Sequence, residues 1–368
     1  MTQIRAAGPL SGLAELAQDD PGVAGWLSAI GAASFELSAA PGVAPLAIAG
    51  LAARRRPVLA VTSTGREAED LAGVLAALLG DERVALFPSW ETLPHERLSP
   101  RSDTVGRRLA VLRRLAHPSG DDPATGPLDV VVAPVRAILQ PHVPSLGDLE
   151  PVALRRGDTA ELDDLVRRLV GAGYARVDLV ERRGELAVRG GILDVFPPTE
   201  EHPLRVELWG DEVEEIRYFK VVDQRSLEIA EHGLWAPPCR ELLLTDPVRE
   251  RAAALLGRHP ELAELLEPIS RGEAVEGMES LAPVLVDQLR LVLHELPAGC
   301  HVVLGDPQRV AARARELAAT SEEFLAASWA AAAGGGVSPI DLGAASLRSL
   351  ADAQEQAREL GLPWWTIT

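Results

Sequence analysis

The chain has 368 residues, of which 47% are hydrophobic, and a formal net charge of -18. The hydrophobic content excludes a chain that is disordered by composition, and the length allows two or three domains. The negative charge repels phosphate backbones on average. It argues against a general DNA-binding protein while permitting a local basic face, and its simplest role is to keep the protein soluble.

Metal, disulfide and membrane chemistry find little support in the sequence. The two cysteines, Cys239 and Cys300, form no CxxC pair, so neither a zinc site nor a disulfide framework is expected. Four acids at 211–215 lack the spacing of a calcium loop and fit a solvated hairpin edge better than a cation site. There is no signal peptide and no apolar run of about 18 residues, so we expect a cytoplasmic location.

The first 147 residues alternate between helical and strand patterns. In chain order we expect helices at 11–30 and 46–56, a strand at 57–64, a helix at 65–80, a strand at 83–88, a helix at 102–116 and a strand at 128–134. Ser102 or Asp103 is expected to cap the helix that begins there. Such alternation predicts a parallel sheet with helices on both faces.

The pattern changes after this segment. A helix at about 159–172 precedes several short strands, and turn residues lie at 183–184, 190–191 and 210–211. Alternating polarity predicts antiparallel strands with one wet face, hence an inserted β-rich domain at about 148–230. Beyond it, ELLLT (241–245), HVVLGDP (301–307) and helices around 247–270 and 307–328 fit one further α/β lobe. The final WWTIT resembles a strand, and we expect the sequence to be a piece of a longer chain.

A nucleotide site would be expected after the first strand of such a lobe, but its chemistry is missing. A phosphate-binding loop needs several free backbone N–H groups, a lysine, and a serine or threonine that holds magnesium. The one candidate, residues 40–46, has a single glycine, Gly42, and neither a lysine nor a hydroxyl. Pro45 also removes one backbone donor. The sequence therefore predicts no productive ATP binding, no catalytic residue and no cofactor.

Two strings resemble a known family. They are FPSWETLPHERLSPRSDTVGRRLAVLRRL (87–115) and GELAVRGGILDVFPPTEEHPLRVELWGDEVEEIRYFKVVDQRS (184–226). Both resemble the amino-terminal module of the transcription-repair coupling factors, the Mfd family, with actinobacterial members the most similar. The second string is also similar to domain 2 of the excision-repair protein UvrB. The resemblance covers about 31–368.

The resemblance implies an α/β fold, with a P-loop-NTPase-like parallel-sheet lobe that is interrupted by a β-rich α+β domain. In this layout domain 1a is 1–147, domain 2 is 148–230, and domain 1b is 231–368 and packs on domain 1a. In the family, domain 2 binds UvrA, the damage-recognition ATPase, and recruits it to stalled RNA polymerase in transcription-coupled nucleotide excision repair. An alternative that the resemblance leaves open is a UvrB-like, DNA-dependent ATPase or helicase module.

Full-length coupling factors carry further parts that this chain lacks. They add a domain that binds RNA polymerase and an ATP-dependent DNA translocase motor that uses ATP and magnesium. The carboxy-terminal part also masks domain 2 until polymerase is engaged, so a chain without it is expected to bind UvrA constitutively. RNA polymerase and DNA are accordingly expected to be contacted mainly through the missing domains.

The resemblance also assigns residues. The UvrA-binding arginines and glutamate of UvrB match Arg176, Arg189 and Glu207, and a further UvrB arginine falls on Ala187. Guanidinium groups suit this role because they form bidentate bonds to carboxylates. The alternative is that Arg176 or Arg189 pairs with a neighbouring acid of its own sheet, Asp178 or Glu185. The Walker lysine and threonine of UvrB fall on Ala44 and Pro45, the degeneration usual in coupling factors.

Four further positions in these strings have expected roles. Gly190 and Gly191 are expected to permit a bulge or a close approach of strands, and Phe196 to close the core of domain 2. Trp209 fits a core or an interface equally well.

UvrB inserts a tyrosine-rich hairpin into DNA near the region that matches 87–101. Here that region is short and has two aromatic residues, Phe87 and Trp90. Strand separation by stacking needs several aromatics against bases, so we expect damage verification to be absent.

Overall fold

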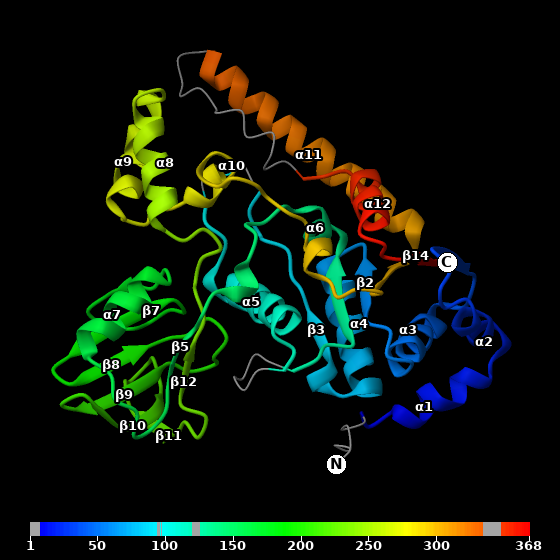
Figure 1. Cartoon of the computed structure of the whole chain (residues 1–368), viewed down its shortest axis with the longest axis horizontal. Coiled ribbons are helices and arrows are strands. Elements are labelled where there is room, and N and C mark those ends of the chain that lie inside the picture. Colours follow the sequence, from blue (N-terminus) through cyan, green and yellow to red (C-terminus); the bar gives the residue numbers. More distant parts are fainter. Residues whose placement is uncertain (1–7, 94–95, 97, 120–125, 334–346) are drawn as a thin grey trace.

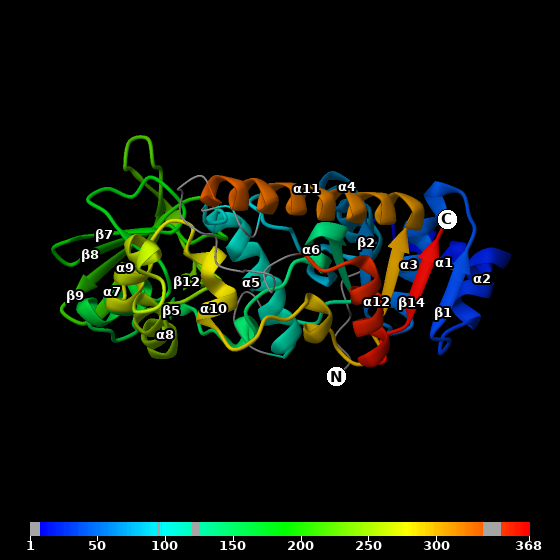
Figure 2. The same ribbon diagram turned by 90° about the horizontal axis from the view of Figure 1, so that it is seen from above.

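The computed structural model describes residues 8–93, 96, 98–119, 126–333 and 347–368. The molecule is elongated. A six-stranded sheet with helices on both faces occupies one end and a β-rich domain the other (Figures 1 and 2). A small helical unit lies beside the β-rich domain, at the same end of the molecule.

All neighbouring strands of the large sheet are parallel, in the order β1-β14-β13-β2-β4-β3. The strands are β1 (Ser34–Leu37), β2 (Val58–Thr62), β3 (Val84–Leu86), β4 (Val130–Pro134), β13 (His301–Gly305) and β14 (Trp364–Ile367). Every residue of β2 and β4 is buried, as expected for short apolar strands that are covered on both faces. The predicted parallel sheet is therefore confirmed.

Two hydrophobic cores lie on the two faces of this sheet. One face packs against α5 (Ser102–Ala116), α6 (Val135–Leu139), α11 (Pro307–Ala333) and α12 (Leu350–Glu359). The other packs against α2 (Pro21–Ser28), α3 (Ala44–Ala53) and α4 (Gly65–Leu79), with α1 (Ser11–Leu16) beyond them. Among the described residues no helix combines the length and the apolar character needed to cross a membrane.

The expected cap of α5 was wrong. Arg101 occupies the N-cap position and no side chain there accepts a backbone hydrogen bond; Ser102 and Asp103 lie in the first turn. The Asp103 carboxylate instead pairs with Arg101, at 3.1 Å, and with Arg107, at 3.6 Å. The acid still lies where the helix dipole favours a negative charge.

The β-rich domain has its own six-stranded sheet, in the order β11-β10-β9-β8-β7-β6. Its elements are α7 (Leu162–Gly171), β6 (Ala175–Arg176), β7 (Glu185–Arg189), β8 (Ile192–Val195), β9 (Leu204–Trp209), β10 (Glu212–Phe219) and β11 (Ser226–Ile229). All neighbours are antiparallel except β6 and β7. One face forms a hydrophobic core with α7, and the other is largely polar, as predicted.

A two-stranded antiparallel ribbon, β5 (Val152–Leu154) with β12 (Leu234–Ala236), joins this domain to the rest of the chain. The segments that enter and leave the domain are thus paired directly. The β-rich unit therefore extends from 152 to 236, a few residues later at each end than the change of pattern in the sequence indicates.

The part of the chain after β12 does not form one α/β lobe. Residues 241–245 form no strand, and α8 (Asp246–Leu256), α9 (Ala263–Arg271) and α10 (Ala282–Leu285) make a helical unit with its own small core. After these helices the chain returns to the large lobe with a 3₁₀ turn (Val292–Glu295), β13, α11, α12 and β14, and β14 lies between β1 and β13. Trp365 of β14 contacts the Trp26 ring edge to face, with centroids 4.5 Å apart.

Candidate functional site

The outer face of the β-rich sheet carries two of the three residues assigned to partner binding. The register pairs Arg189 of β7 with Ile192 of β8, and Ile192 with Glu207 of β9. Directly paired residues point to the same face of a sheet, so Arg189 and Glu207 lie on one face, with Ile192 between them. Leu186 and Val206 belong to the opposite, core-facing set.

Within the part of the chain that the structure describes, Arg189 and Glu207 form no ion pair with each other or with another charged side chain. The exposed Arg189 guanidinium donates to the backbone oxygen of Asp178, at 2.9 Å. No hydrogen bond or ion pair of Glu207 is found within the described part of the chain, although its charge contributes to the raised pKa of Arg205 and of Arg217. The expected alternative, a pair between Arg189 and Asp178 or Glu185, is replaced by this single backbone contact.

Two other arginines on this face already have an acidic partner. Arg205 makes a bidentate pair with the nearly buried Asp194, at 2.7 and 2.8 Å, and this hydrogen bonding raises the pKa of Arg205. Arg217 pairs with Glu215, and this hydrogen bond lowers the pKa of Glu215. Within the described residues, Arg205 and Arg217 are thus each paired with an acid of the same face, whereas Arg189 and Glu207 form no ion pair.

The end of the outer face that holds Arg189 and Glu207 is called the corner below. Arg176 does not lie there. It lies on β6 in parallel register with Leu186, whose side chain is in the core on the other face. The next residue, Val177, packs on the outer-face cluster, as the alternation of a strand requires. The exposed Arg176 is thus on a strand next to Arg189 but on the opposite face of the sheet.

The position of Ala187, where the resemblance places a further arginine, would not accept that side chain. It is buried in a small cluster with Val180, Phe196 and Phe219 on the outer face. An arginine side chain there would have to displace that cluster. Phe196 is buried in this secondary cluster and not in the main core of the domain, which refines its expected role.

The two glycines at the tip of the β7–β8 hairpin allow the close approach of strands that the sequence predicts. Gly190 has φ +60°, and a Cβ on Gly191 would lie 2.8 Å from the backbone oxygen of Leu208. This close approach brings the β7–β8 tip against β9 just before its last residue, Trp209. Trp209 is 81% exposed, so it is not a core residue.

The segment that was expected to match a phosphate-binding loop, residues 40–46, follows β1. Residues Pro41–Val43 form a single 3₁₀ turn in which the Val43 N–H donates to the oxygen of Ala40, at 2.9 Å. Ala44 and Pro45 are the first residues of α3, and Gly42 is exposed with open space around its Cα. The turn therefore uses one donor internally and lacks another at Pro45, which leaves few N–H groups for an oxyanion.

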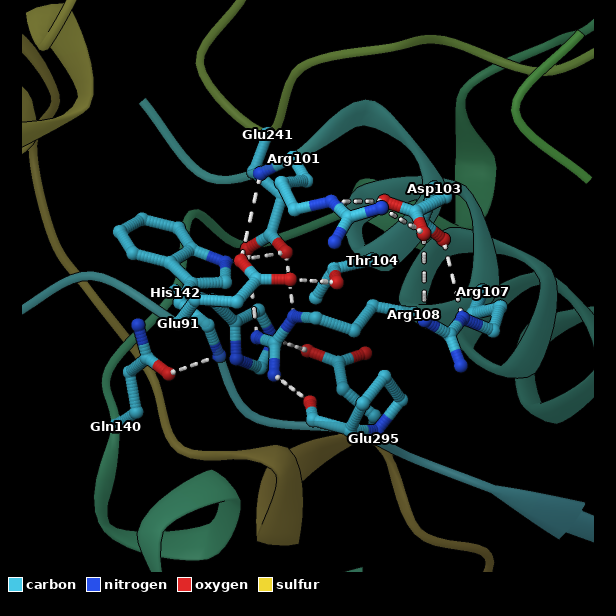
Figure 3. A network of polar contacts seen from close by, with 12 residues as sticks. Glu91, Arg101, Asp103, Thr104, Arg107, Arg108, Gln140, His142, Glu241 and Glu295 are labelled. Carbon is cyan, nitrogen blue, oxygen red and sulfur yellow. Dashed lines mark hydrogen bonds and ion pairs between the residues drawn. The ribbon is translucent and has the colours of Figure 1, made fainter. Parts of the chain in front are cut away.

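A buried ion pair joins the large lobe to the segment that leaves the β-rich domain (Figure 3). Arg108 of α5 and Glu241 are 0% and 2% exposed, and Arg108 Nε donates to Glu241 Oε1 at 2.5 Å. Trp90 Nε1 donates to the same carboxylate at 2.9 Å, and Arg108 also donates to the backbone oxygen of Pro88 at 2.9 Å. The guanidinium carbon lies 4.3 Å from the centre of the Phe87 ring.

This network holds the segment that follows β3 in place. Phe87 and Trp90 are both buried, and the Trp90 N–H donates to Gln140 at 3.2 Å. At the outer edge of the network, Thr104 donates to Glu91 and the Arg101 N–H donates to the same carboxylate (Figure 3). His142 lies 3.7 Å from Glu295, and this nearby imidazole holds the pKa of Glu295 below the ordinary value.

Sequence reasoning missed this pair. Arg108 stands on the apolar face of α5, four residues from Thr104 and from Leu112, so its helical position was a usable signal of a buried charge. Its partner is 133 residues away, beyond the whole β-rich domain. No local pattern identifies Glu241.

Comparisons with known proteins agree with this arrangement. A family model described as "UvrB interaction domain" matches residues 152–237, almost the limits of the β5–β12 ribbon. The chain is 50% identical, over 98% of its length, to the "Transcription-repair-coupling factor" of Mycobacterium tuberculosis, and covers 30% of that protein. The Bacillus subtilis protein of the same name is 32% identical over 65% of the chain and 18% of the relative. "UvrABC system protein B" of Streptomyces avermitilis is 31% identical over 59% of the chain and 31% of the relative.

The fold and these matches define a UvrB-like module, in which a UvrB interaction domain is inserted into a parallel α/β lobe. More specifically, the chain belongs to the transcription-repair coupling factor (Mfd) family and corresponds to its amino-terminal module. It spans 30% of the length of the mycobacterial coupling factors to which it was compared.

Proposed function

We propose that this chain is an adaptor that recruits UvrA to stalled RNA polymerase in transcription-coupled excision repair, and that it has no ATPase activity of its own. The observation that carries the proposal is the corner of the β-rich sheet where Arg189 and Glu207 lie on one face without charged partners. An exposed cation and an acid that form no ion pair within the described residues are suited to a polar interface, where charges set register and specificity.

The binding test compares two charge deletions with a control. Arg189→Ala and Glu207→Ala should each weaken binding of UvrA by about 2 kcal/mol, roughly thirtyfold in Kd, measured by isothermal titration calorimetry. Arg225→Ala is the matched control, since its side chain is 84% exposed and lies beyond the far end of β10. Unchanged affinity in an Arg189→Ala, Glu207→Ala double variant would reject this surface.

Arg176 requires a separate test because it faces the other side of the sheet. If the partner wraps around the β6 edge, Arg176→Ala weakens UvrA binding and its effect adds to that of Arg189→Ala. If the partner covers only the outer face, Arg176→Ala leaves the affinity unchanged. Either result decides whether the assignment taken from UvrB applies to this position.

The alternative function, a UvrB-like ATPase, makes a different prediction. A ligand that binds the native state at a hundred times its Kd raises stability by about 2.7 kcal/mol, which is easily seen as a shift in melting temperature. The 3₁₀ turn at 41–43 and the proline at 45 argue against such binding. A thermal shift with Mg-ATP, abolished by substitutions in residues 40–46, would support the ATPase instead.

Regulation by masking follows from the same surface. In a full-length relative, a carboxy-terminal part that covers the corner would lower the apparent affinity for UvrA by the fraction of molecules that are open. This chain alone should then bind UvrA more tightly than a full-length relative does. Tighter binding by the full-length protein would contradict masking.

A further inference from the structure

Trp209 is the largest of the exposed hydrophobic side chains of the β-rich domain. Along β9, residues Leu204 and Val206 face the core, and Leu208 packs against it, so the alternation of the strand turns Trp209 outward. It is the last residue of the strand and is 81% exposed. The side chain does not contribute to the core, although burying an indole away from water is strongly favourable.

The position of Trp209 places it at the charged corner. It is two residues beyond Glu207 on the same strand and therefore on the same face, and Glu207 is linked through Ile192 to Arg189. The neighbouring hairpin tip, Gly190-Gly191, approaches β9 closely enough that any side chain on Gly191 would clash there. An apolar ring thus stands near a cation and an acid that form no ion pair within the described residues, with no bulky residue at the adjacent tip.

We propose that Trp209 is the aromatic anchor of the docking surface, and that it inserts into an apolar recess of a protein partner. The proposal rests on the proposed function and names the partner's chemistry. The recess is flanked by a carboxylate that meets Arg189 and by a guanidinium or ammonium group that meets Glu207. Tryptophan and arginine are the residues most enriched among those that dominate binding energy at protein interfaces.

The charges around Trp209 favour a protein over a nucleic acid. A tryptophan can also stack on an unpaired base, but such sites combine aromatic rings with a basic groove that follows the phosphates. Here the ring is flanked by Glu207 and by Glu212, its register partner on β10, and Asp211 occupies the turn between them. These carboxylates repel a phosphate backbone.

The test uses the whole 368-residue chain, with UvrA as the titrated probe. Trp209→Ala should weaken binding by at least about tenfold in Kd, whereas Trp209→Phe, which keeps an aromatic ring, should stay within about threefold of the unchanged chain. Val222→Ala is the control, because Val222 is 97% exposed on the turn after the far end of β10; it should change the Kd by less than about twofold. The melting temperature should not change in any of the three, since none of these side chains is buried.

The outcomes separate the two levels of the proposal. If the unchanged chain binds UvrA and Trp209→Ala binds equally well, the anchor is refuted and the proposed function stands. If the unchanged chain does not bind UvrA, the proposed function fails and the anchor fails with it. If Trp209→Ala loses affinity for a single-stranded oligonucleotide but not for UvrA, the residue serves nucleic-acid binding and the inference is overturned.

Discussion

Removal of the Glu241 carboxylate should destabilise the junction between the large lobe and the β-rich domain. Glu241→Ala leaves the Arg108 guanidinium buried with only the Pro88 oxygen as a hydrogen-bond acceptor, and it leaves Trp90 Nε1 without one. Breaking a buried pair by removing one partner costs about 3–5 kcal/mol. We therefore expect a loss of about 4 kcal/mol, which lowers the melting temperature of the lobe by roughly 10 °C.

The double substitution Arg108→Met, Glu241→Leu tests the reason for that loss. Replacing a buried ion pair by apolar side chains of similar volume is often neutral or stabilising, because both desolvation penalties disappear. The remaining cost is the unsatisfied Trp90 N–H, about 1–3 kcal/mol. The double variant should thus melt above the Glu241→Ala single variant in a thermal or urea titration followed by circular dichroism. A double variant less stable than the single one would refute the argument from an unpaired buried charge.

Two further predictions concern packing and burial. Gly106→Ala in α5 should destabilise the protein by about 1–3 kcal/mol, because the new Cβ would lie 2.5 Å from Pro198 of the β-rich domain; Gly73→Ala in α4, which has open space, should stabilise it by about 0.5–1 kcal/mol. If urea titrations showed that both substitutions change the free energy of unfolding in the same direction, the steric explanation would be excluded. Burial raises the pKa of Cys239 and of Cys300 to about 12, so neither thiol should react with a thiol reagent at pH 8 until the chain unfolds, and stability should fall from about pH 9 towards pH 12 as only the unfolded thiols ionise. Stoichiometric labelling of the native protein at pH 8 would contradict this.

Local pattern was enough to predict most elements of the fold. The strands at 58–62 and 130–134 are continuous apolar runs, and α5 at 102–116 follows a helical period, so each is specified within its own segment. The segment 241–245 was wrongly included in an α/β lobe because ELLLT has the composition of a strand. It is buried at Glu241 and Leu242, yet it has no neighbouring strand with which to pair.

Pairings between distant segments were beyond the reach of the sequence. β14 lies between β1 and β13, and its pairing with β1 joins residues about 330 positions apart. Parallel neighbours of this kind leave no local signal in the sequence. The same holds for the Arg108–Glu241 pair. In the candidate site, the resemblance supplied the residue types, but the register alone shows that Arg189 and Glu207 share a face and that Arg176 does not.

The contacts at the junction between the large lobe and the β-rich domain hold the corner in a defined orientation. An adaptor transmits position only if its docking surface is held in a defined orientation relative to the rest of the chain. Here the paired β5–β12 ribbon, the contact of Gly106 with Pro198, and the Arg108–Glu241 pair all restrain the β-rich domain at its inner end. The unpaired charges and Trp209 lie on the other side of the domain's core, at the hairpin tips. Substitutions of Arg108 or Glu241 should therefore leave the Kd for UvrA unchanged in a calorimetric titration, since no hydrogen bond or ion pair between described residues joins that pair to Arg189 or Glu207.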